Sequence, residues 1–215
     1  MIRPQLLSRN SDQTSLSFVR MSILFGVSLC LSACWGAAPS VYYTLVSPSS
    51  TLSQPKPTQA DFHSLGVGPI TLPEHLDRPH LVTRKGKHTL QVHIRHRWGA
   101  SLRDQILNQL EANLVSELSG ISIVSYPWER PWRPSHQLMM EIKSLEGMMD
   151  LEVNAEFVWR IIDLKTEKVL HQGRYKAQSS ARRKGQEPIE TAYVRAMAET
   201  LSNFAKELSR LLQSQ

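Results

Sequence analysis

Two pairs of side chains have residue types and spacing that could do chemistry. Glu152 and Glu156 stand four positions apart in a strand-like segment, and paired carboxylates can perform acid–base catalysis. Large apolar residues alternate with them, so a solvated strand face explains them better. His93 and His96 could bind a metal, but their odd spacing places them on opposite faces of a strand, and the neighbouring Arg95 repels cations. Neither pair predicts a catalytic or metal site.

Motifs of common enzyme classes do not occur in the sequence. It contains no Gly-x-Ser-x-Gly elbow, no P-loop and no zinc-protease helix motif. Gly66 and Gly68 form a Gly-x-Gly, but Pro69 follows at once and no strand-to-helix context supports a phosphate loop. We therefore expect no enzymatic activity, no metal and no cofactor.

Cys34 is the residue whose chemistry the sequence does predict. It follows a leader with three arginines, an apolar run over 21–31 and the small residues Ser32 and Ala33, which is the layout of a secretory signal over 1–33. The run is about half the roughly 20 residues that a transmembrane helix needs. Leu31-Ser32-Ala33-Cys34 resembles the lipobox of bacterial lipoproteins, in which the cysteine thiol is acylated. A plain secretory signal with an incidental cysteine is the alternative.

The composition of the chain limits its number of domains, its covalent sites and its classes of partner. Removing 1–33 from the 215 residues leaves enough for one ordinary domain. The only cysteines are Cys30, which leaves with the signal, and Cys34, so we expect neither a disulfide nor a zinc–cysteine site. The net charge is +6, and loss of three arginines and one aspartate with the signal leaves +4. Behind a secretory signal this favours lipid headgroups or an acidic protein as partners over nucleic acid.

Hydrophobic periodicity predicts an α/β fold. The sequence favours a single domain with a mixed β-sheet packed by two long amphipathic helices. Leucines recur at helical spacing over 101–118, and a second helical stripe follows Pro188. Strands are predicted at 41–45, 65–72, 81–83, 90–96, 121–125, 137–145, 151–162 and 169–177.

Proline density divides the mature chain. Residues 34–60 are rich in Pro, Ser, Thr and Gln, which predicts a lipidated cysteine and a flexible tether with one short strand, followed by the domain over 61–215. Within that domain, alternation predicts that Leu90, Val92 and Ile94 face the core and that His93 and Arg95 face solvent.

Two proline-stiffened segments are candidate protein interfaces. The turn from Leu72 to Arg84 is held by Pro73 and Pro79 and is expected to present an Asp–Arg pair beside exposed apolar residues. The loop over 126–134 has three prolines and two tryptophans, a residue type that is enriched at binding hot spots. Loop tryptophans also cap cores, and the sequence does not separate the two roles. The candidate interface residues are Leu72, Leu76, Asp77, Arg78, Trp128 and Trp132.

Several of these segments together resemble one family. The segments that carry the likeness occur in this order: the lipobox at Cys34, then Tyr42-Tyr43-Thr44-Leu45, then Gly66-Val67-Gly68-Pro69-Ile70-Thr71-Leu72-Pro73 running into Leu76-Asp77-Arg78-Pro79, then Val82-Thr83-Arg84, and finally Tyr126-Pro127-Trp128. In this respect the chain resembles the PqiC family, the ABC-type transport auxiliary lipoproteins. The likeness extends over nearly all of the mature chain.

The resemblance implies a role in the cell envelope. It implies a lipoprotein on the periplasmic face of the outer membrane, assembled as a homo-oligomeric ring that docks an inner-membrane-anchored MCE-domain protein for lipid transport. Trp35 after the cysteine is not the aspartate associated with inner-membrane retention, which favours the outer membrane. Two rival hypotheses are direct shielding of lipid by the domain, with basic residues at anionic headgroups, and a structural or assembly lipoprotein without a transport role.

Overall fold

The computed structural model describes residues 38–46, 56–57, 63–129 and 131–214. One compact unit runs from Ser40 to Gln215. The predicted signal and Cys34 lie outside the described residues, so both stay predictions. The unit begins within the segment predicted as a tether and includes its short strand.

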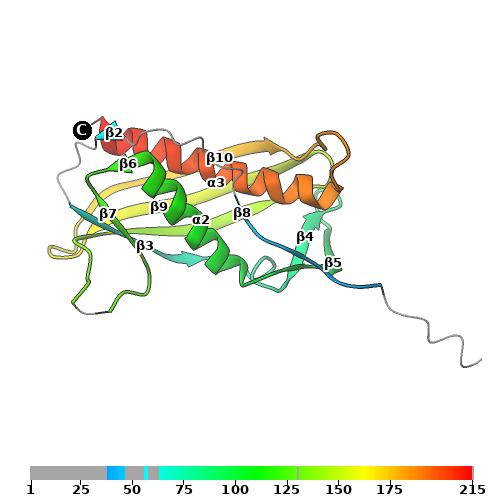
Figure 1. The fold of residues 1–215 in the computed structure, drawn as a ribbon, viewed down its shortest axis with the longest axis horizontal. Coiled ribbons are helices and arrows are strands. Elements are labelled where there is room, and N and C mark those ends of the chain that lie inside the picture. Colours follow the sequence, from blue (N-terminus) through cyan, green and yellow to red (C-terminus); the bar gives the residue numbers. More distant parts are fainter. Residues whose placement is uncertain (1–37, 47–55, 58–62, 130, 215) are drawn as a thin grey trace, which may run out of the picture. The chain divides into compact units, whose positions relative to one another are not determined.

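A five-stranded mixed sheet is the centre of this unit (Figure 1). Its strand order is β10-β9-β8-β3-β7, with bounds His136–Met148 for β8, Glu152–Asp163 for β9, Val169–Ser180 for β10, Ser64–Thr71 for β3 and Ser122–Ser125 for β7. Strands β8, β9 and β10 form an antiparallel meander, whereas β3 runs parallel to both β7 and β8. Parallel neighbours need long crossovers, and one of these carries the first helix.

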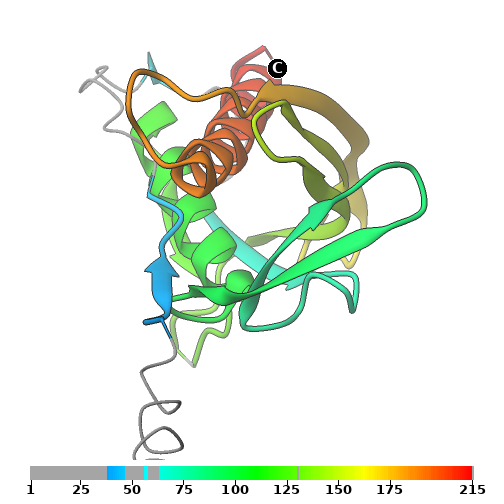
Figure 2. The same cartoon turned by 90° about the vertical axis from the view of Figure 1, so that its right-hand side faces the viewer.

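Two helices cover one face of the sheet (Figures 1 and 2). Helix α2 spans Leu102–Glu117 and α3 spans Ile189–Gln213. The Ser101 hydroxyl accepts the N–H of Asp104 at the start of α2, and Pro188 precedes α3, as the sequence predicts for helix starts. The α/β fold with a mixed sheet and two helices is therefore confirmed.

The core lies between the two helices and the five-stranded sheet, and its aromatic part lies between α3 and the meander. Phe157 of β9 has no exposed surface, and its ring stacks on Tyr175 of β10 at a centroid distance of 5.6 Å. Phe204 of α3 meets Phe157 edge-on at 5.5 Å and Tyr175 at 5.3 Å. These three rings join the helix to two strands, because aromatic pairs add attraction beyond the area they bury.

A second, three-stranded sheet stands apart from the first. Its order is β1-β5-β4, where β1 is Val41–Tyr43, β4 is His80–Arg84 and β5 is Leu90–Trp98. Strands β4 and β5 form an antiparallel hairpin, and β1 lies parallel to the end of β5. Figure 2 shows this hairpin projecting from the rest of the unit.

The hairpin corrects one prediction. Leu90 and Val92 keep 37% and 38% of their surface exposed, and Ile94 keeps 75%, so these three do not face the core. The hairpin projects from the rest of the unit (Figure 2), and a register shift of β5 between His93 and Arg97 interrupts the expected alternation. His93, predicted to face solvent, is instead half-buried.

Short contacts join the start of the unit to α2. Leu45 is 5% exposed, and its N–H donates to the Gln105 side-chain oxygen at 2.8 Å. Strands β2 (Lys56–Pro57) and β6 (Leu118–Ser119) form a small parallel pair at the other end of α2. Sequence reasoning did not anticipate this pair, because two residues carry no periodic signal.

Candidate functional site

The turn between β3 and β4 is ordered by backbone contacts. The N–H groups of Leu76 and Asp77 both donate to the Pro73 carbonyl, at 2.9 and 3.1 Å. Leu72 and Leu76 are 8% and 2% exposed and belong to the core. The expectation of exposed apolar residues beside Asp77 is therefore wrong for these two leucines, which hold the turn against the domain.

Asp77 and Arg78 do not pair with each other. The Asp77 carboxylate bonds to Arg103 at the start of α2, while the Arg78 side chain is exposed. Both residues border a pocket whose floor is Trp98 and Leu102. The ion pair links the turn to the start of α2, but it is largely solvated and so contributes little to stability.

Trp128 lies against the main sheet. A Cβ atom on Gly66 of β3 would come within 2.5 Å of the Trp128 ring and 2.6 Å of Pro134, so only glycine admits this packing. Tyr126 meets Trp128 edge-on at a centroid distance of 5.2 Å, and its N–H donates to the Val67 carbonyl at 2.8 Å. Trp128 therefore fastens the loop to the sheet.

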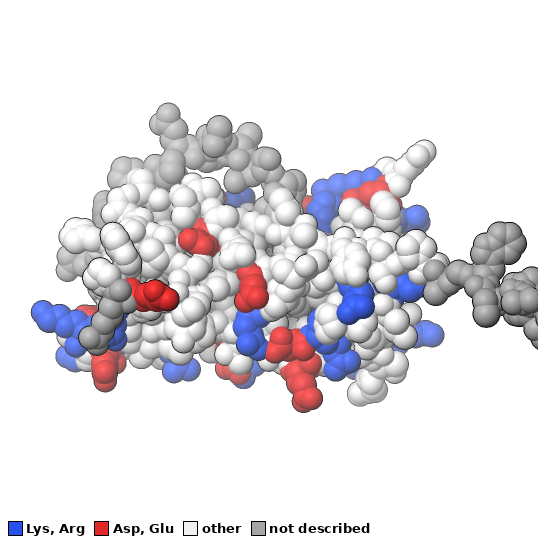
Figure 3. Space-filling model, turned by 60° about the horizontal axis from the view of Figure 1, so that its bottom comes forward, with Lys and Arg blue, Asp and Glu red and all other residues white. Residues whose placement is uncertain are grey.

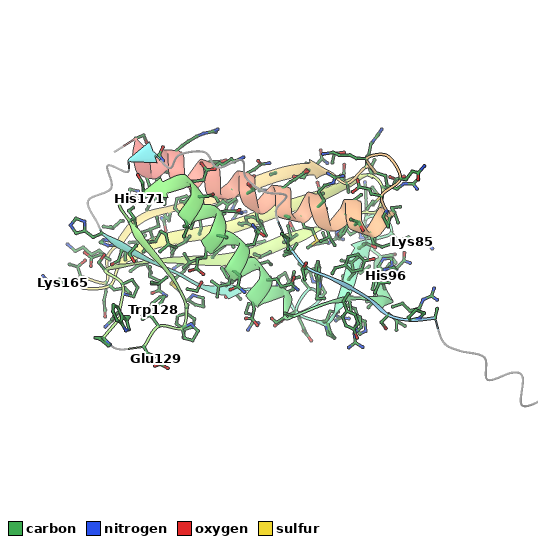
Figure 4. The ribbon with its side chains drawn as sticks, viewed as in Figure 1. Lys85, His96, Trp128, Glu129, Lys165 and His171 are labelled. Atoms are coloured by element: carbon green, nitrogen blue, oxygen red, sulfur yellow. The ribbon has the colours of Figure 1, made fainter. Side chains whose placement is uncertain are left out.

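Trp132 is the tryptophan of this loop that faces solvent. It is 78% exposed, and its N–H donates to the Glu129 carbonyl at 2.8 Å, which closes a turn behind it. The structure thus divides the two roles that the sequence left open: Trp128 supports the loop and Trp132 is presented by it. Figure 4 shows Trp128 and Glu129 at the end of the unit opposite Lys85 and His96.

A buried carboxylate joins the hairpin to the meander. Glu146 of β8 is 2% exposed and accepts two hydrogen bonds from Arg84, at 3.1 and 2.8 Å, and one from the Leu145 N–H. The Tyr193 hydroxyl of α3 accepts the Gly147 N–H and donates to the Val82 carbonyl. Burial raises the pKa of Tyr193, so its hydroxyl stays neutral and holds both partners. This network is structural, and the sequence pattern did not indicate it.

A second polar cluster joins β1, β5 and α3. The Tyr43 hydroxyl lies 2.9 Å from Nδ1 of His96, whose Nε2 is 3.7 Å from Glu190. His93 reaches the Thr83 hydroxyl at 2.8 Å, and the His93 and His96 rings meet edge-on at 6.0 Å. The prediction that these two histidines lie on opposite faces of the strand is therefore wrong, because the register of β5 shifts between His93 and Arg97. Across the described residues, no group of three or more His, Cys, Asp or Glu is placed to hold a metal ion.

This histidine cluster predicts a pH-dependent stability. Burial lowers the pKa of His93, and His96 lowers it further, while Glu190 acts in the opposite direction. Folding therefore favours neutral His93, so its contribution is complete above about pH 6.5, the unfolded value, and is lost as the pH falls below it. Urea unfolding between pH 7.5 and 5 should show this loss.

A His93→Gln variant is the matched control for that experiment. Glutamine keeps a hydrogen-bonding group near Thr83 but does not titrate, so stability should fall less steeply below pH 6.5 than in the unmodified chain. Equal slopes in the two proteins would show that His93 is not the group responsible.

The two glutamates considered for acid–base chemistry lie on the solvated side of β9. Glu156 pairs with Arg174 and, at 3.3 Å, with Lys176, both on the neighbouring β10. The Glu152 carboxylate accepts the Asn154 side-chain amide. Cross-strand pairing of opposite charges accounts for Glu156, and a bond to Asn154 on the same strand accounts for Glu152.

Comparison with known protein families shows which family this chain belongs to. The model of the ABC-type transport auxiliary lipoprotein component matches residues 43–209. This chain belongs to that family. The auxiliary lipoprotein matches no curated protein in sequence. None of its helices in the described ranges is both long and apolar enough to cross a bilayer.

Two solved structures share the fold of this auxiliary lipoprotein, and a third matches it with a lower score. The crystal structure of an uncharacterized protein matches with a TM-score of 0.64 at 17% identity, covering 81% of this chain and 99% of that one. Protein XCC0632 from Xanthomonas campestris matches with a TM-score of 0.58 at 14% identity, covering 83% and 95% of the two chains. A PelC dodecamer from Paraburkholderia phytofirmans matches at 0.41 and 13% identity, over 68% and 91%.

Proposed function

We propose that this auxiliary lipoprotein is the outer-membrane component of an MCE-type lipid transport system. In this role Cys34 is acylated, the domain is held at the periplasmic face of the outer membrane, and the domain docks an inner-membrane-anchored MCE protein. The family match supports a transport auxiliary role, and the exposed Trp132 supports docking.

The position of Trp132 carries the docking part of the proposal. The unit begins at β1, which pairs with β5, and Figure 4 places the Trp128 loop at the far end from His96 of β5. An anchor upstream of β1 therefore leaves the Trp132 end directed away from its membrane. Tryptophan is enriched among the residues that contribute most to protein interfaces, so the exposed Trp132 is the candidate anchor for a partner.

A Trp132→Ala variant should bind an MCE partner at least about 30-fold more weakly. This corresponds to about 2 kcal/mol, the lower limit for an interface hot spot. Because Trp132 is 78% exposed, the substitution should leave the free energy of unfolding unchanged. Binding is measured by titrating the purified MCE protein against the surface-immobilised lipoprotein.

Tyr42→Ala supplies a matched control. Tyr42 is an exposed aromatic at the opposite end, with 63% of its surface accessible, and its removal should leave partner binding unchanged. Equal affinities of the Trp132 and Tyr42 variants would contradict docking through this loop. Failure of the unmodified chain to bind any MCE protein would favour a structural or assembly lipoprotein.

Self-association into a ring is part of the same proposal. In the described part of the chain β10 pairs only with β9, so its outer edge is open along Val169–Ser180. Long open edges are usually covered, and a second copy would cover this one. Native mass spectrometry of the purified lipoprotein gives the number of copies.

A further inference from the structure

The β4–β5 hairpin presents an apolar strip to solvent. Leu90 and Val92 stand at the two-residue spacing that places side chains on one face of a strand, and Ile94 follows at the same spacing where the register of β5 begins to shift. All three are exposed, Ile94 at 75%. Isolated exposed aliphatic residues are common, but three in a row on a projecting element indicate a surface that contacts an apolar phase.

Positive charge surrounds this strip. From His80 to Trp98 the sequence contains no Asp or Glu, while Arg84, Lys85, Lys87, Arg95 and Arg97 are basic. Arg84 is neutralised by the buried Glu146, but Lys85, Lys87 and Arg95 are exposed. In Figure 3, the end of the unit where Figure 1 places β4 and β5 shows several blue side chains on white surface, with a red group beside the blue ones at its upper edge.

The same hairpin lies close to the anchor position. Val41 of β1 pairs with His96 of β5, and Val41 is seven positions after Cys34. Seven extended residues reach at most about 25 Å. The six-residue distance along β5 from His96 to Leu90 is about 20 Å, so an anchored chain can lay the whole strip on the bilayer.

We propose that the hairpin surface formed by Leu90, Val92, Ile94, Lys85, Lys87 and Arg95 binds the anionic lipid surface to which the chain is anchored. The aliphatic side chains enter the boundary between headgroups and acyl chains, and the lysine and arginine side chains contact lipid phosphates. This inference rests on the proposed membrane anchor and adds that the domain is held in one orientation.

A lipid surface fits this patch better than a second copy of the chain. Two hairpins facing each other would bring like charges together, which opposes association. A stable protein interface typically uses about 20–30 residues on each side, far more than this strip provides. A weak membrane contact needs no such area, because the anchor already confines the hairpin near the bilayer.

Site-specific fluorescence tests the proposal. Mature chain 34–215 carries Cys34→Ser and an N-terminal hexahistidine tag, which binds nickel-chelating lipid in place of the acyl anchor. This chain contains no cysteine, so Ile94→Cys adds the only thiol for a nitrobenzoxadiazole label. Vesicles contain phosphatidylethanolamine and phosphatidylglycerol, with a nitroxide quencher in the headgroup region.

The label at position 94 should be quenched at least twofold more than a label at Leu170→Cys. Leu170 is a comparably apolar exposed residue, and its neighbour His171 lies at the opposite end of the unit in Figure 4. Combining Lys85→Glu, Lys87→Glu and Arg95→Glu should reduce quenching at position 94 to the Leu170 value. Raising NaCl from 0.15 to 1 M should act in the same direction.

Three results would overturn the proposal. Equal quenching at positions 94 and 170 would show that the hairpin does not contact lipid, and unchanged quenching on neutral phosphatidylcholine vesicles would exclude the role of charge. Emission already blue-shifted at position 94 before vesicles are added would assign the strip to a second copy. The experiment needs neither acylation nor an MCE partner, so its failure leaves the docking role unaffected, and Trp132→Ala should not change the quenching.

Discussion

Replacing Phe157 by alanine is expected to destabilise the domain by about 3–5 kcal/mol. Its ring has no exposed surface and contacts both Tyr175 and Phe204, so the substitution removes a large buried side chain and leaves a cavity between α3 and the meander. Neighbouring strands fix the backbone of β9 on both sides, which limits collapse into that cavity. Urea unfolding followed by circular dichroism measures the loss.

Phe157→Leu separates the cavity from other effects. Leucine fills much of the same volume, so its cost should be less than half that of alanine. If alanine costs under 1 kcal/mol, the three-ring cluster is not the centre of the core. Trp132→Ala, which removes an exposed ring of similar size, should leave the unfolding midpoint unchanged and shows that burial decides the cost.

Cys34→Ser should move the protein from the membrane fraction to the soluble fraction almost completely. A serine hydroxyl does not replace the thiol in lipoprotein acylation, and each acyl CH₂ in the bilayer contributes about 0.8 kcal/mol to membrane attachment. Membrane fractionation with incorporation of radiolabelled palmitate measures both attachment and acylation.

The fractions obtained with Cys34→Ser also test the hairpin contact. Contact through Lys85, Lys87 and Arg95 alone should be weak and released by 1 M salt. A Cys34→Ser protein that stays with membranes through a salt wash, with palmitate still incorporated elsewhere, would contradict anchoring at this cysteine. Cys30→Ser lies in the predicted signal and is the matched substitution that should change neither result.

Periodicity in the sequence predicts most of the regular structure. The predicted helix over 101–118 is observed at Leu102–Glu117, and strands predicted at 137–145, 151–162 and 169–177 are observed as β8, β9 and β10. These elements are long, and each has one apolar face against the core. The spacing of their apolar residues therefore matches the side of each element that is buried. The strands form sheets of five and three with one two-stranded pair, a division that spacing alone does not reveal.

The wrong predictions concern apolar residues whose burial or exposure in the structure differs from what the sequence pattern indicates. Alternation along Leu90, Val92 and Ile94 correctly predicts a strand face but assigns it to the core, because the pattern carries no information about what lies opposite. Leu72 and Leu76 show the converse error, since turns between prolines are usually exposed and this one folds back onto the domain. Neither the exposure of the hairpin residues nor the burial of the two leucines depends on local secondary-structure propensity.

Helix α2 shows a further limit of predicting burial from the spacing of apolar residues. Its leucine stripe predicts the helix, yet Gln105, Gln109 and Asn113 are also buried on it. Gln109 donates to the Asn113 side-chain oxygen at 3.0 Å, and Gln105 accepts from Leu45. Polar residues at helical spacing are ordinarily assigned to solvent, and here a bond from outside the helix to Gln105 and the bond between Gln109 and Asn113 make burial possible.

The hydrogen bond from Leu45 to Gln105 has a consequence for the architecture of the whole system. It holds the first strand and the residues after it on the domain, so only a few residues separate the folded unit from the predicted acylation position. In the proposed role, an anchor this near in sequence would keep the domain beside its own bilayer. The proposed MCE partner would then have to provide the entire span between the two membranes.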